Sequence, residues 1–173
     1  AHGDGPDGVQ VHITNTSNLP VEALELEYPM LVERYELAPD SGGAGRHRGG
    51  LGIIRQYQVL TDDVRVRTKG DRNVIAPWGL QGGHSGGRSR VVRNVGTPHE
   101  QELTPKEYDL LLKAGETLLV VTPGAGGYGP PGERAQAAIL RDVQEGKLSP
   151  QLASDVYGLR PEDLPDVGPV GPG

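Results

Sequence analysis

The residues best suited to hold a metal ion lie at the start of the chain, where His2, Asp4, Asp7 and His12 occur close together. Imidazole nitrogens and carboxylate oxygens are common ligands of divalent ions. However, none of the five histidines has HxH, HxxxH or HExxH spacing. The glycine loop around these residues also lacks the outer groups that orient metal ligands. A solvated loop is the favoured interpretation, and no metal ligand is assigned.

A glycine-rich stretch at 41–50 carries two arginines, Arg46 and Arg48. Successive backbone N–H groups in such a turn can bind an anion, and the guanidinium groups would add positive charge. The alternative is a wide hairpin whose arginines pair with acidic side chains, namely Glu33, Glu36 or Asp40. This structural interpretation is favoured over the anion site.

Two other glycine-rich stretches could also bind a ligand through their backbone. Residues 82–89 almost fit the phosphate-binding pattern GxxxxGK[ST], with Arg88 in place of lysine. That loop requires a strand before it and a helix after it, whereas a strand-like segment follows here. Residues 122–129 could approach a ligand, but glycines there more often permit tight packing of a strand against a helix. Both stretches are interpreted as structural turns.

Candidates for acid–base or nucleophilic chemistry are few. Asp71 with Arg72, and Glu33 with Arg34, are neighbouring acid–base pairs that are more often structural than catalytic. No serine lies in a GxSxG elbow, and no His and acid partner can be assigned to Ser41 or Ser85 in their glycine turns.

Composition narrows the class of protein. The 173 residues are about one domain, with 27 glycines and 15 prolines, near the level at which disorder is suspected. The absence of cysteine excludes disulfides and thiolate chemistry and fits the cytoplasm. A net charge of −6 argues against nucleic acid or an anionic membrane as a partner, and no apolar run is long enough to span a membrane.

The elements are predicted from periodicity. Alternation of apolar and polar residues predicts strands over 9–13 and 64–69. Further strands are predicted over 31–37, 51–60 and 91–95, and two apolar runs lie over 110–112 and 117–122. A short helix is predicted over 21–27, ending before Pro29, and residues 78–80 resemble a packed turn.

The last third is predicted to be helical. A helix over 133–145 ends at Gly146, and a second helix begins with Ser149 as N-cap and Pro150 at the first position. The proline-rich tail from Arg160 is predicted to lack regular structure. The expected fold is therefore α+β and mainly β, an antiparallel domain over 1–158 with glycine-rich turns and two short C-terminal helices, followed by a tail over 159–173.

An ordered set of motifs resembles one known family. The motifs are residues 7–8, 14–18 with Pro20, Glu22 and Glu25, 27–29, 34–37, 39–45, 49–52, 71–72, 77–79, 122–124, 126–129, 141–143 and 155–158. Together they are similar to the C-terminal part of the B subunit of hydantoinase/oxoprolinase enzymes. That family includes N-methylhydantoinase B, 5-oxoprolinase and the large subunit of acetone carboxylase.

The resemblance implies a share in an ATP-dependent enzyme that opens a cyclic amide. In that chemistry the carbonyl oxygen is phosphorylated, and metal-bound water or bicarbonate then attacks. Relatives use the same activation to carboxylate ketones. The implied partners are a kinase-like A subunit and the N-terminal portion of the B subunit, with a cyclic amide or ketone as substrate. ATP, Mg²⁺ and a divalent metal are expected in the complete complex, and none is expected on this chain.

The polar residues expected to contribute to that chemistry are Thr14, Asn15, Thr16, Arg46 and Arg72. The chain is not expected to be active alone. Two alternatives remain open: a noncatalytic module that completes its fold against partners, and a free-standing domain that binds an anion at the turn with Arg46 and Arg48.

Overall fold

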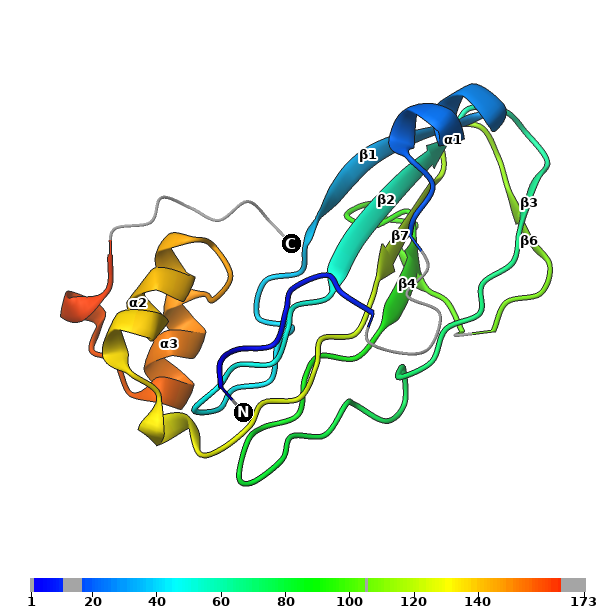
Figure 1. Ribbon diagram of the computed structural model, residues 1–173. Helices are drawn as coiled ribbons and strands as arrows, with labels where there is room; N and C mark the ends of the chain where they lie inside the picture. Colours follow the sequence, from blue (N-terminus) through cyan, green and yellow to red (C-terminus); the bar gives the residue numbers. More distant parts are fainter. Residues whose placement is uncertain (1, 11–16, 105, 166–173) are drawn as a thin grey trace.

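The computed structural model describes residues 2–10, 17–104 and 106–165 and consists of a β-rich body with a helical lobe at one end (Figure 1). The helices and strands, in chain order, are α1 (Val21–Glu27), β1 (Met30–Leu37), β2 (Ile53–Val59), β3 (Val64–Val66), β4 (Arg90–Arg93), β5 (Gln101–Glu102), β6 (Leu110–Leu112), β7 (Thr117–Val121), η1 (Pro131–Glu133), α2 (Gln136–Gln144), α3 (Pro150–Tyr157) and η2 (Pro161–Asp163).

The body is built on a five-stranded antiparallel sheet with strand order β1-β2-β7-β4-β5, and β3 and β6 form a second, two-stranded sheet. Side chains alternate between the two faces of a strand. Consequently the neighbours Leu118 and Leu119 of β7 enter two different apolar clusters. Leu119 packs with Ile54 and Val92, while Leu118 packs with Val59 and with Leu112 of the small sheet.

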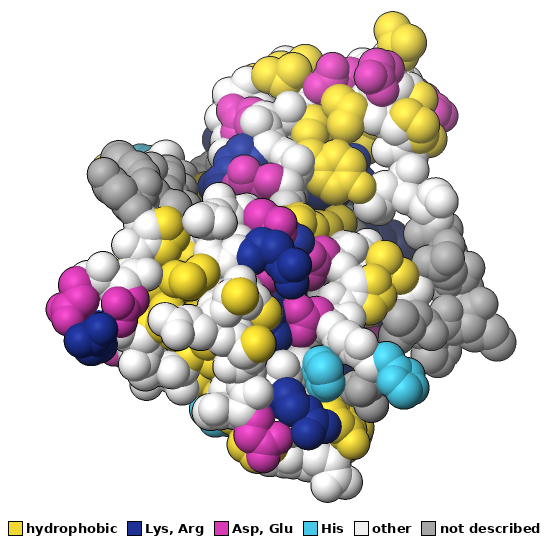
Figure 2. Space-filling model, turned by 60° about the vertical axis from the view of Figure 1, so that its left-hand side comes forward, with side chains coloured by type: hydrophobic (Ala, Val, Ile, Leu, Met, Phe, Trp, Pro, Cys, Tyr) yellow, Lys and Arg dark blue, Asp and Glu magenta, His cyan; other side chains and the backbone are white. Residues whose placement is uncertain are grey.

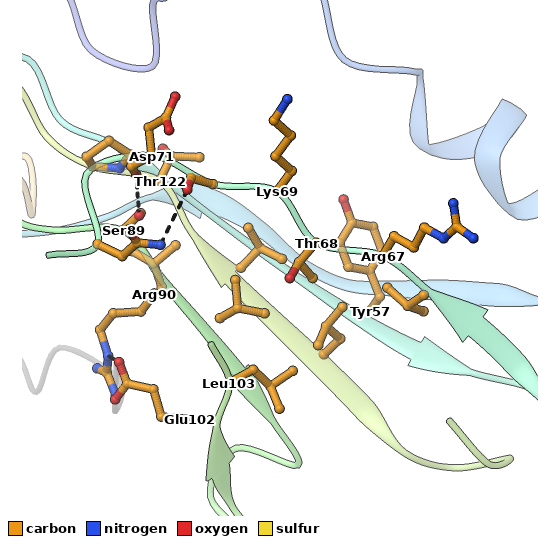
Figure 3. A pocket seen from close by; sticks show the side chains of 18 of the residues that line it. Tyr57, Arg67, Thr68, Lys69, Asp71, Ser89, Arg90, Glu102, Leu103 and Thr122 are labelled. Carbon is orange, nitrogen blue, oxygen red and sulfur yellow. Dashed lines mark hydrogen bonds and ion pairs between the residues drawn. The ribbon is translucent and has the colours of Figure 1, made fainter. Parts of the chain in front are cut away.

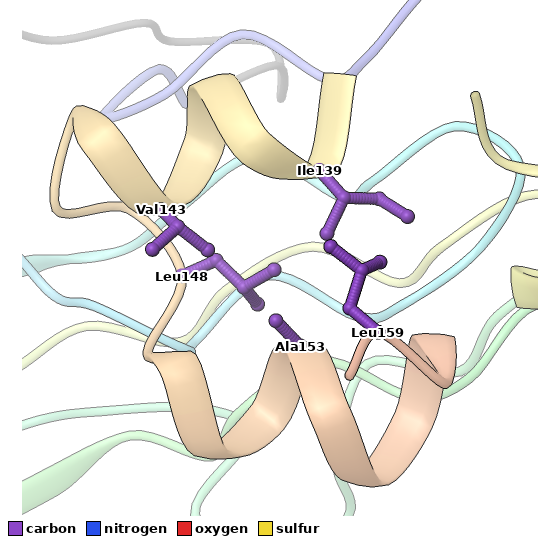
Figure 4. Packing of buried hydrophobic residues seen from close by; sticks show 5 residues of the cluster. All are labelled: Ile139, Val143, Leu148, Ala153 and Leu159. Atoms are coloured by element: carbon purple, nitrogen blue, oxygen red, sulfur yellow. The ribbon is translucent and has the colours of Figure 1, made fainter. Parts of the chain in front are cut away.

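The helical lobe has a core of its own (Figure 4). Its buried side chains come from α2, α3 and the residues that flank them: Ile139, Val143, Leu148, Ala153 and Leu159. Helix α3 begins as the sequence predicts, because the Ser149 hydroxyl oxygen accepts a hydrogen bond from Leu152 N at 3.1 Å. It ends at Gly158, whose φ of 72° is left-handed.

The predicted fold class is confirmed, and most predicted elements exist. Helix α1 has the predicted bounds, and the predicted strands from residue 31 onward are present with shifts of a few residues. The predicted strand over 9–13 is not supported at Val9 and Gln10, which lie in no strand, and its remaining residues lie outside the described ranges. Strand β5 is not predicted from the sequence, because two polar residues carry no periodic signal.

Two predictions about local structure are wrong. The tail is not devoid of regular structure, since Pro161–Asp163 form a 3₁₀ turn and the adjacent Leu164 packs on the helical lobe. The side chains of residues 78–80 do not form a packed turn, because Trp78 and Leu80 are exposed. Within the described residues, no helix has the length and apolar character needed to cross a membrane.

Candidate functional site

Three glycine-rich segments, 41–52, 77–87 and 122–129, lie side by side and connect the sheet with the helical lobe (Figure 1). We call them the glycine bundle. Backbone hydrogen bonds join each segment to the other two: Gly43 N to Ala125 O (2.8 Å), His84 N to Ala44 O (2.7 Å) and Gly127 N to His84 O (2.9 Å). Backbone pairing of this kind satisfies polar groups that side chains would otherwise have to reach.

The glycines of the bundle allow backbone to touch backbone. A Cβ added at Gly124 would collide with the carbonyl oxygen of Ser41, and one at Gly126 would collide with that of Trp78. Neither carbonyl belongs to a flexible side chain, so neither can move aside cheaply. The structural interpretation of these turns is therefore the one supported at 122–129, although the segment packs on other loops rather than on a helix.

Arg48, in the first segment of the bundle, is almost fully buried. Its Nη1 donates to Asp7 Oδ1 at 2.9 Å, and its Nε donates to Asp142 Oδ2 at 3.3 Å. The sequence predicts that the arginines of the 41–50 stretch pair with Glu33, Glu36 or Asp40. The prediction of pairing is confirmed, but the predicted partners are wrong, because Arg48 turns toward the N-terminal segment and α2.

Arg134, just before α2, completes a buried network of charges. Its guanidinium donates to both oxygens of Asp4 and, through Nη2, to Asp142 Oδ2 at 2.6 Å. We call Asp4, Asp7, Arg48, Arg134 and Asp142 the ion network. It links the N-terminal segment, the glycine bundle and the helical lobe. Figure 2 shows basic and acidic side chains side by side near the middle of one face of the molecule, whereas Arg48, Arg134 and Asp142 themselves are buried.

The network shifts the pKa of its carboxyl groups. Burial raises the pKa of Asp4, but hydrogen bonds from Arg134 and from the Arg48 backbone outweigh burial, so the pKa lies below its ordinary value. Burial acts likewise on Asp7, and the bonds from Arg48 and Leu51 N again lower its pKa. Both groups are thus held as carboxylates. The hypothesis that Asp4 and Asp7 hold a metal does not fit their arginine partners.

Arg46 lies on the surface of the bundle. Its Nη1 is 3.3 Å from Glu133 Oε2, and its guanidinium carbon is 6.0 Å from the centre of the Tyr128 ring. This partner is not among those that the sequence predicts. An exposed pair of this kind holds the side chain weakly, so Arg46 is accessible to a ligand or a partner.

Arg72 lies over the Trp78 ring, with its guanidinium carbon 4.7 Å from the ring centre. Its φ of 63° is left-handed, which costs a non-glycine residue free energy. Among the described residues Arg72 makes no ion pair, so the predicted pair with Asp71 is wrong. Arg46 and Arg72 thus have separate aromatic partners, Tyr128 and Trp78.

The remaining residues singled out in the sequence have structural roles or lie outside the described residues. Thr14, Asn15 and Thr16 lie outside the described residues, as does His12. Arg34 pairs with Glu36 rather than Glu33, and Glu33 accepts a hydrogen bond from Gln56. Ser41 is buried, donates to Ala38 O and accepts from Gly52 N, which is a structural role. Residues 82–89 are followed by β4, so the phosphate-loop pattern is not realised.

A cavity of about 490 Å³ lies between the five-stranded sheet and the segment after β3 (Figure 3). Its apolar floor is formed by Val91, Leu103, Leu118 and Val120, and Tyr57 reaches into it from β2. Its polar rim includes Lys69, Asp71, Ser89 and Thr122. Burial raises the pKa of Tyr57, which keeps its hydroxyl protonated as a hydrogen-bond donor. The volume is in the range of small-molecule pockets.

Sequence reasoning missed the residues that hold the site together. Arg134 stands out in the sequence only as part of a predicted helix, Asp142 as part of that helix and of the 141–143 motif, and Tyr57 only as part of a strand. The partners in the ion network are 41 to 130 residues apart except within the lobe, so no spacing rule reveals them. The available signal is the cluster of Asp4 and Asp7 beside glycine, which by itself is typical of a solvated loop.

The chain belongs to the hydantoinase B/oxoprolinase family, whose sequence profile matches residues 1–131. It is 42% identical over 145 residues to an uncharacterized protein of Methanocaldococcus jannaschii, covering 83% of this chain and 25% of that protein. It is 34% identical over 165 residues to the B subunit of a putative D-/L-hydantoinase from a Pseudomonas species, covering 95% of this chain and 28% of that relative. The family predicted from the motifs is confirmed.

Two solved structures share the fold. A nucleotide-free acetone carboxylase has a TM-score of 0.80 at 21% identity, over 92% of this chain and 25% of its own. The ATP-dependent caprolactamase of Pseudomonas jessenii has a TM-score of 0.66 at 31% identity, over 80% of this chain and 24% of its own. The chain therefore spans about a quarter of the length of these relatives.

Proposed function

We propose that this chain is part of the B component of an ATP-dependent cyclic amide hydrolase of the hydantoinase/oxoprolinase type. The observation that carries the proposal is the match of 95% of the chain, at 34% identity, to the B component of a putative hydantoinase. The likeness to a caprolactamase at 31% identity supports the same class, because a lactam and a hydantoin are both cyclic amides.

Within that enzyme the chain supplies a rigid framework rather than reacting groups. Two features support this role. In the glycine bundle, backbone packs on backbone, and in the ion network Asp4, Asp7 and Asp142 are paired with arginines. Arg46 and Arg72, with Thr14, Asn15 and Thr16, are the polar residues that we assign to the border of the substrate site. Positioning by such groups contributes to catalysis by fixing the geometry of the substrate.

ATP, Mg²⁺ and the divalent metal are assigned to other parts of the complete complex. For a metal ion, the support is that Asp4 and Asp7, the acids that follow His2 in the sequence, are bonded to arginines, and that the described residues contain no group of three or more His, Asp or Glu side chains able to hold one. The partners are a kinase-like A subunit and the N-terminal portion of the B component, in the cytoplasm. Relatives named as subunits of hydantoinase and caprolactamase support an assembly of several chains.

The test is to purify the assembled enzyme that contains this chain and assay it with hydantoin, 5-oxoproline, caprolactam and acetone. ATP-dependent ring opening that is lost when this chain is omitted and restored when it is added back is the expected result. Carboxylation of acetone instead would assign a ketone carboxylase. Full ring-opening activity without this chain would overturn the proposal and favour a noncatalytic assembly module.

A further inference from the structure

Four large apolar side chains lie exposed within one short segment between β3 and β4. Val74, Ile75, Trp78 and Leu80 have exposed fractions of 76%, 67%, 61% and 57%. We call these four residues the apolar strip. Single exposed apolar residues are ordinary, but a contiguous group of large ones marks a surface that contacts another molecule or chain.

At Trp78 and Leu80 the exposure does not come from a loose loop. Leu80 N donates to Gly127 O at 2.9 Å, and Gly86 N donates to Pro77 O at 2.8 Å. Gly79 packs so closely on Gly83 that a Cβ there would collide with its carbonyl group. The backbone from Pro77 to Leu80 is therefore fixed by the glycine bundle, and it presents Trp78 and Leu80 outward in one conformation. A preformed surface loses less conformational entropy when a partner binds.

Positive charge is concentrated in the part of the sequence that carries the apolar strip. Residues 64–90 contain six Lys and Arg residues and one Asp, although the whole chain has a net charge of −6. Arg65 and Arg90 pair with Asp109 and Glu102. Among the described residues, the remaining four make no ion pair: Arg67, Lys69, Arg72 and Arg88.

Two contacts bring this charge to the strip itself. Arg72 stacks on Trp78, and Ser89 N donates to Arg72 O at 3.1 Å, which places Arg88 next to the same edge. An apolar centre with a charged border is the usual anatomy of a protein–protein interface. The border here selects for a partner with acidic side chains.

We propose that the apolar strip docks onto the remaining part of the B component, on an apolar patch bordered by Asp and Glu. This inference rests on the proposed function. The chain spans only about a quarter of these relatives, and under the proposed function the remaining three quarters are the source of the partner surface. A second copy of this chain fits the strip poorly, because a two-fold contact would place equal cationic borders against each other.

The experiment uses the absence of native cysteine in this chain. Ile75→Cys places a thiol in the apolar strip, and Leu26→Cys is the matched control on α1, where Leu26 is 90% exposed. In Figure 1, α1 lies at the top of the view and the green segment 77–87 at the bottom. Maleimide labelling of each variant is followed by mass spectrometry of this chain, alone and in the assembled enzyme.

The expected result is labelling at position 75 that is at least about tenfold slower in the assembled enzyme, with labelling at position 26 unchanged. Arg88→Glu is expected to slow assembly about tenfold at low salt and less at high salt, because it reverses charge at the border. Equal labelling at position 75 in both samples, or equal protection at both positions, would overturn the proposal.

Self-association is tested with the chain alone. Protection at position 75 that rises with concentration, together with a dimer by light scattering, would assign the strip to a second copy and overturn the proposal. The labelling result is independent of activity. Protection at position 75 in an assembly that opens no cyclic amide would support the docking surface and reject the proposed function. Ring opening without protection at position 75 would support the proposed function and reject the docking surface.

Discussion

Arg48 and Asp142 are 94 residues apart in the sequence and form an ion pair in which both side chains are almost fully buried. The pair joins the glycine bundle to α2. The same carboxylate oxygen, Asp142 Oδ2, also accepts from Arg134, so one atom compensates two buried cations. Such an arrangement stabilises a fold only while it is complete, because each partner left alone is a buried charge without compensation.

Asp142→Asn is therefore expected to lower the free energy of unfolding by about 3–5 kcal/mol. Urea denaturation followed by circular dichroism measures this. The matched control is Asp163→Asn, because Asp163 pairs with Arg160 at the surface and such pairs contribute about 0–1 kcal/mol. Equal, small effects of both substitutions would show that the buried network contributes no more than a surface pair.

The ion network also predicts an acid limit to stability. Asp4 and Asp7 have a lower pKa in the folded protein than the ordinary value of 3.8. Carboxyl groups with a depressed folded pKa bind protons more readily when unfolded. Their contribution is thus present above the ordinary value and is lost as the pH falls through the folded pKa. The urea midpoint is expected to be level above about pH 5 and to fall below about pH 4.

Replacing both acids tests the origin of that limit. The double variant Asp4→Asn, Asp7→Asn is expected to be less stable at neutral pH and to show a flatter decline in acid. Asp155→Asn, on the exposed side of α3, is the control that keeps the wild-type decline. An unchanged acid limb in the double variant would assign the limit to other carboxyl groups, among which Glu116 also has a lowered pKa.

Close backbone packing in the glycine bundle predicts a sharp difference between two glycines. Gly124→Ala places a methyl group against the carbonyl of Ser41, and overpacking of this kind costs about 1–3 kcal/mol or more. Gly132→Ala meets nothing within 4 Å and is expected to be neutral or slightly stabilising. Thermal unfolding of the two variants makes the comparison. Equal melting temperatures would show that the bundle yields easily.

Local signals in the sequence are sufficient for the helices and most strands. Ser149, Pro150 and Gly158 define the ends of α3 because caps act over one turn. Apolar residues identify β2 and β7 because side chains on both faces of these strands are packed in apolar clusters. Short β5 gives no such signal, and its pairing with β4 depends on where the chain returns.

The candidate site is less predictable than the fold. The pattern of arginines and glycines indicates that Arg46 and Arg48 differ from ordinary surface residues, but not that one is buried and the other exposed. That difference depends on α2 and the N-terminal segment, which approach Arg48 only in the folded chain. Long-range pairing has no sequence period, so Arg134 and Asp142 can be recognised as partners only from the structure.

Arg46 and Arg72 are expected to contribute to activity more than to folding. Arg46 makes an exposed ion pair with Glu133, and Arg72 stacks on exposed Trp78, so neither contact contributes more than about 1 kcal/mol to folding. Arg46→Ala and Arg72→Ala are expected to leave the unfolding midpoint nearly unchanged. In the assembled enzyme each is expected to lower the rate of ring opening roughly tenfold, equivalent to about 1.4 kcal/mol at the transition state.

Arg160→Ala is the control for this pair, because Arg160 is an exposed arginine whose partners lie within three residues of it in the sequence. It is expected to affect neither stability nor activity. Assembly is measured for every variant by light scattering, so that loss of activity can be separated from loss of the complex. If Arg46→Ala or Arg72→Ala unfolds the chain, its role is structural. If both keep full activity in an intact complex, the border of the substrate site lies elsewhere.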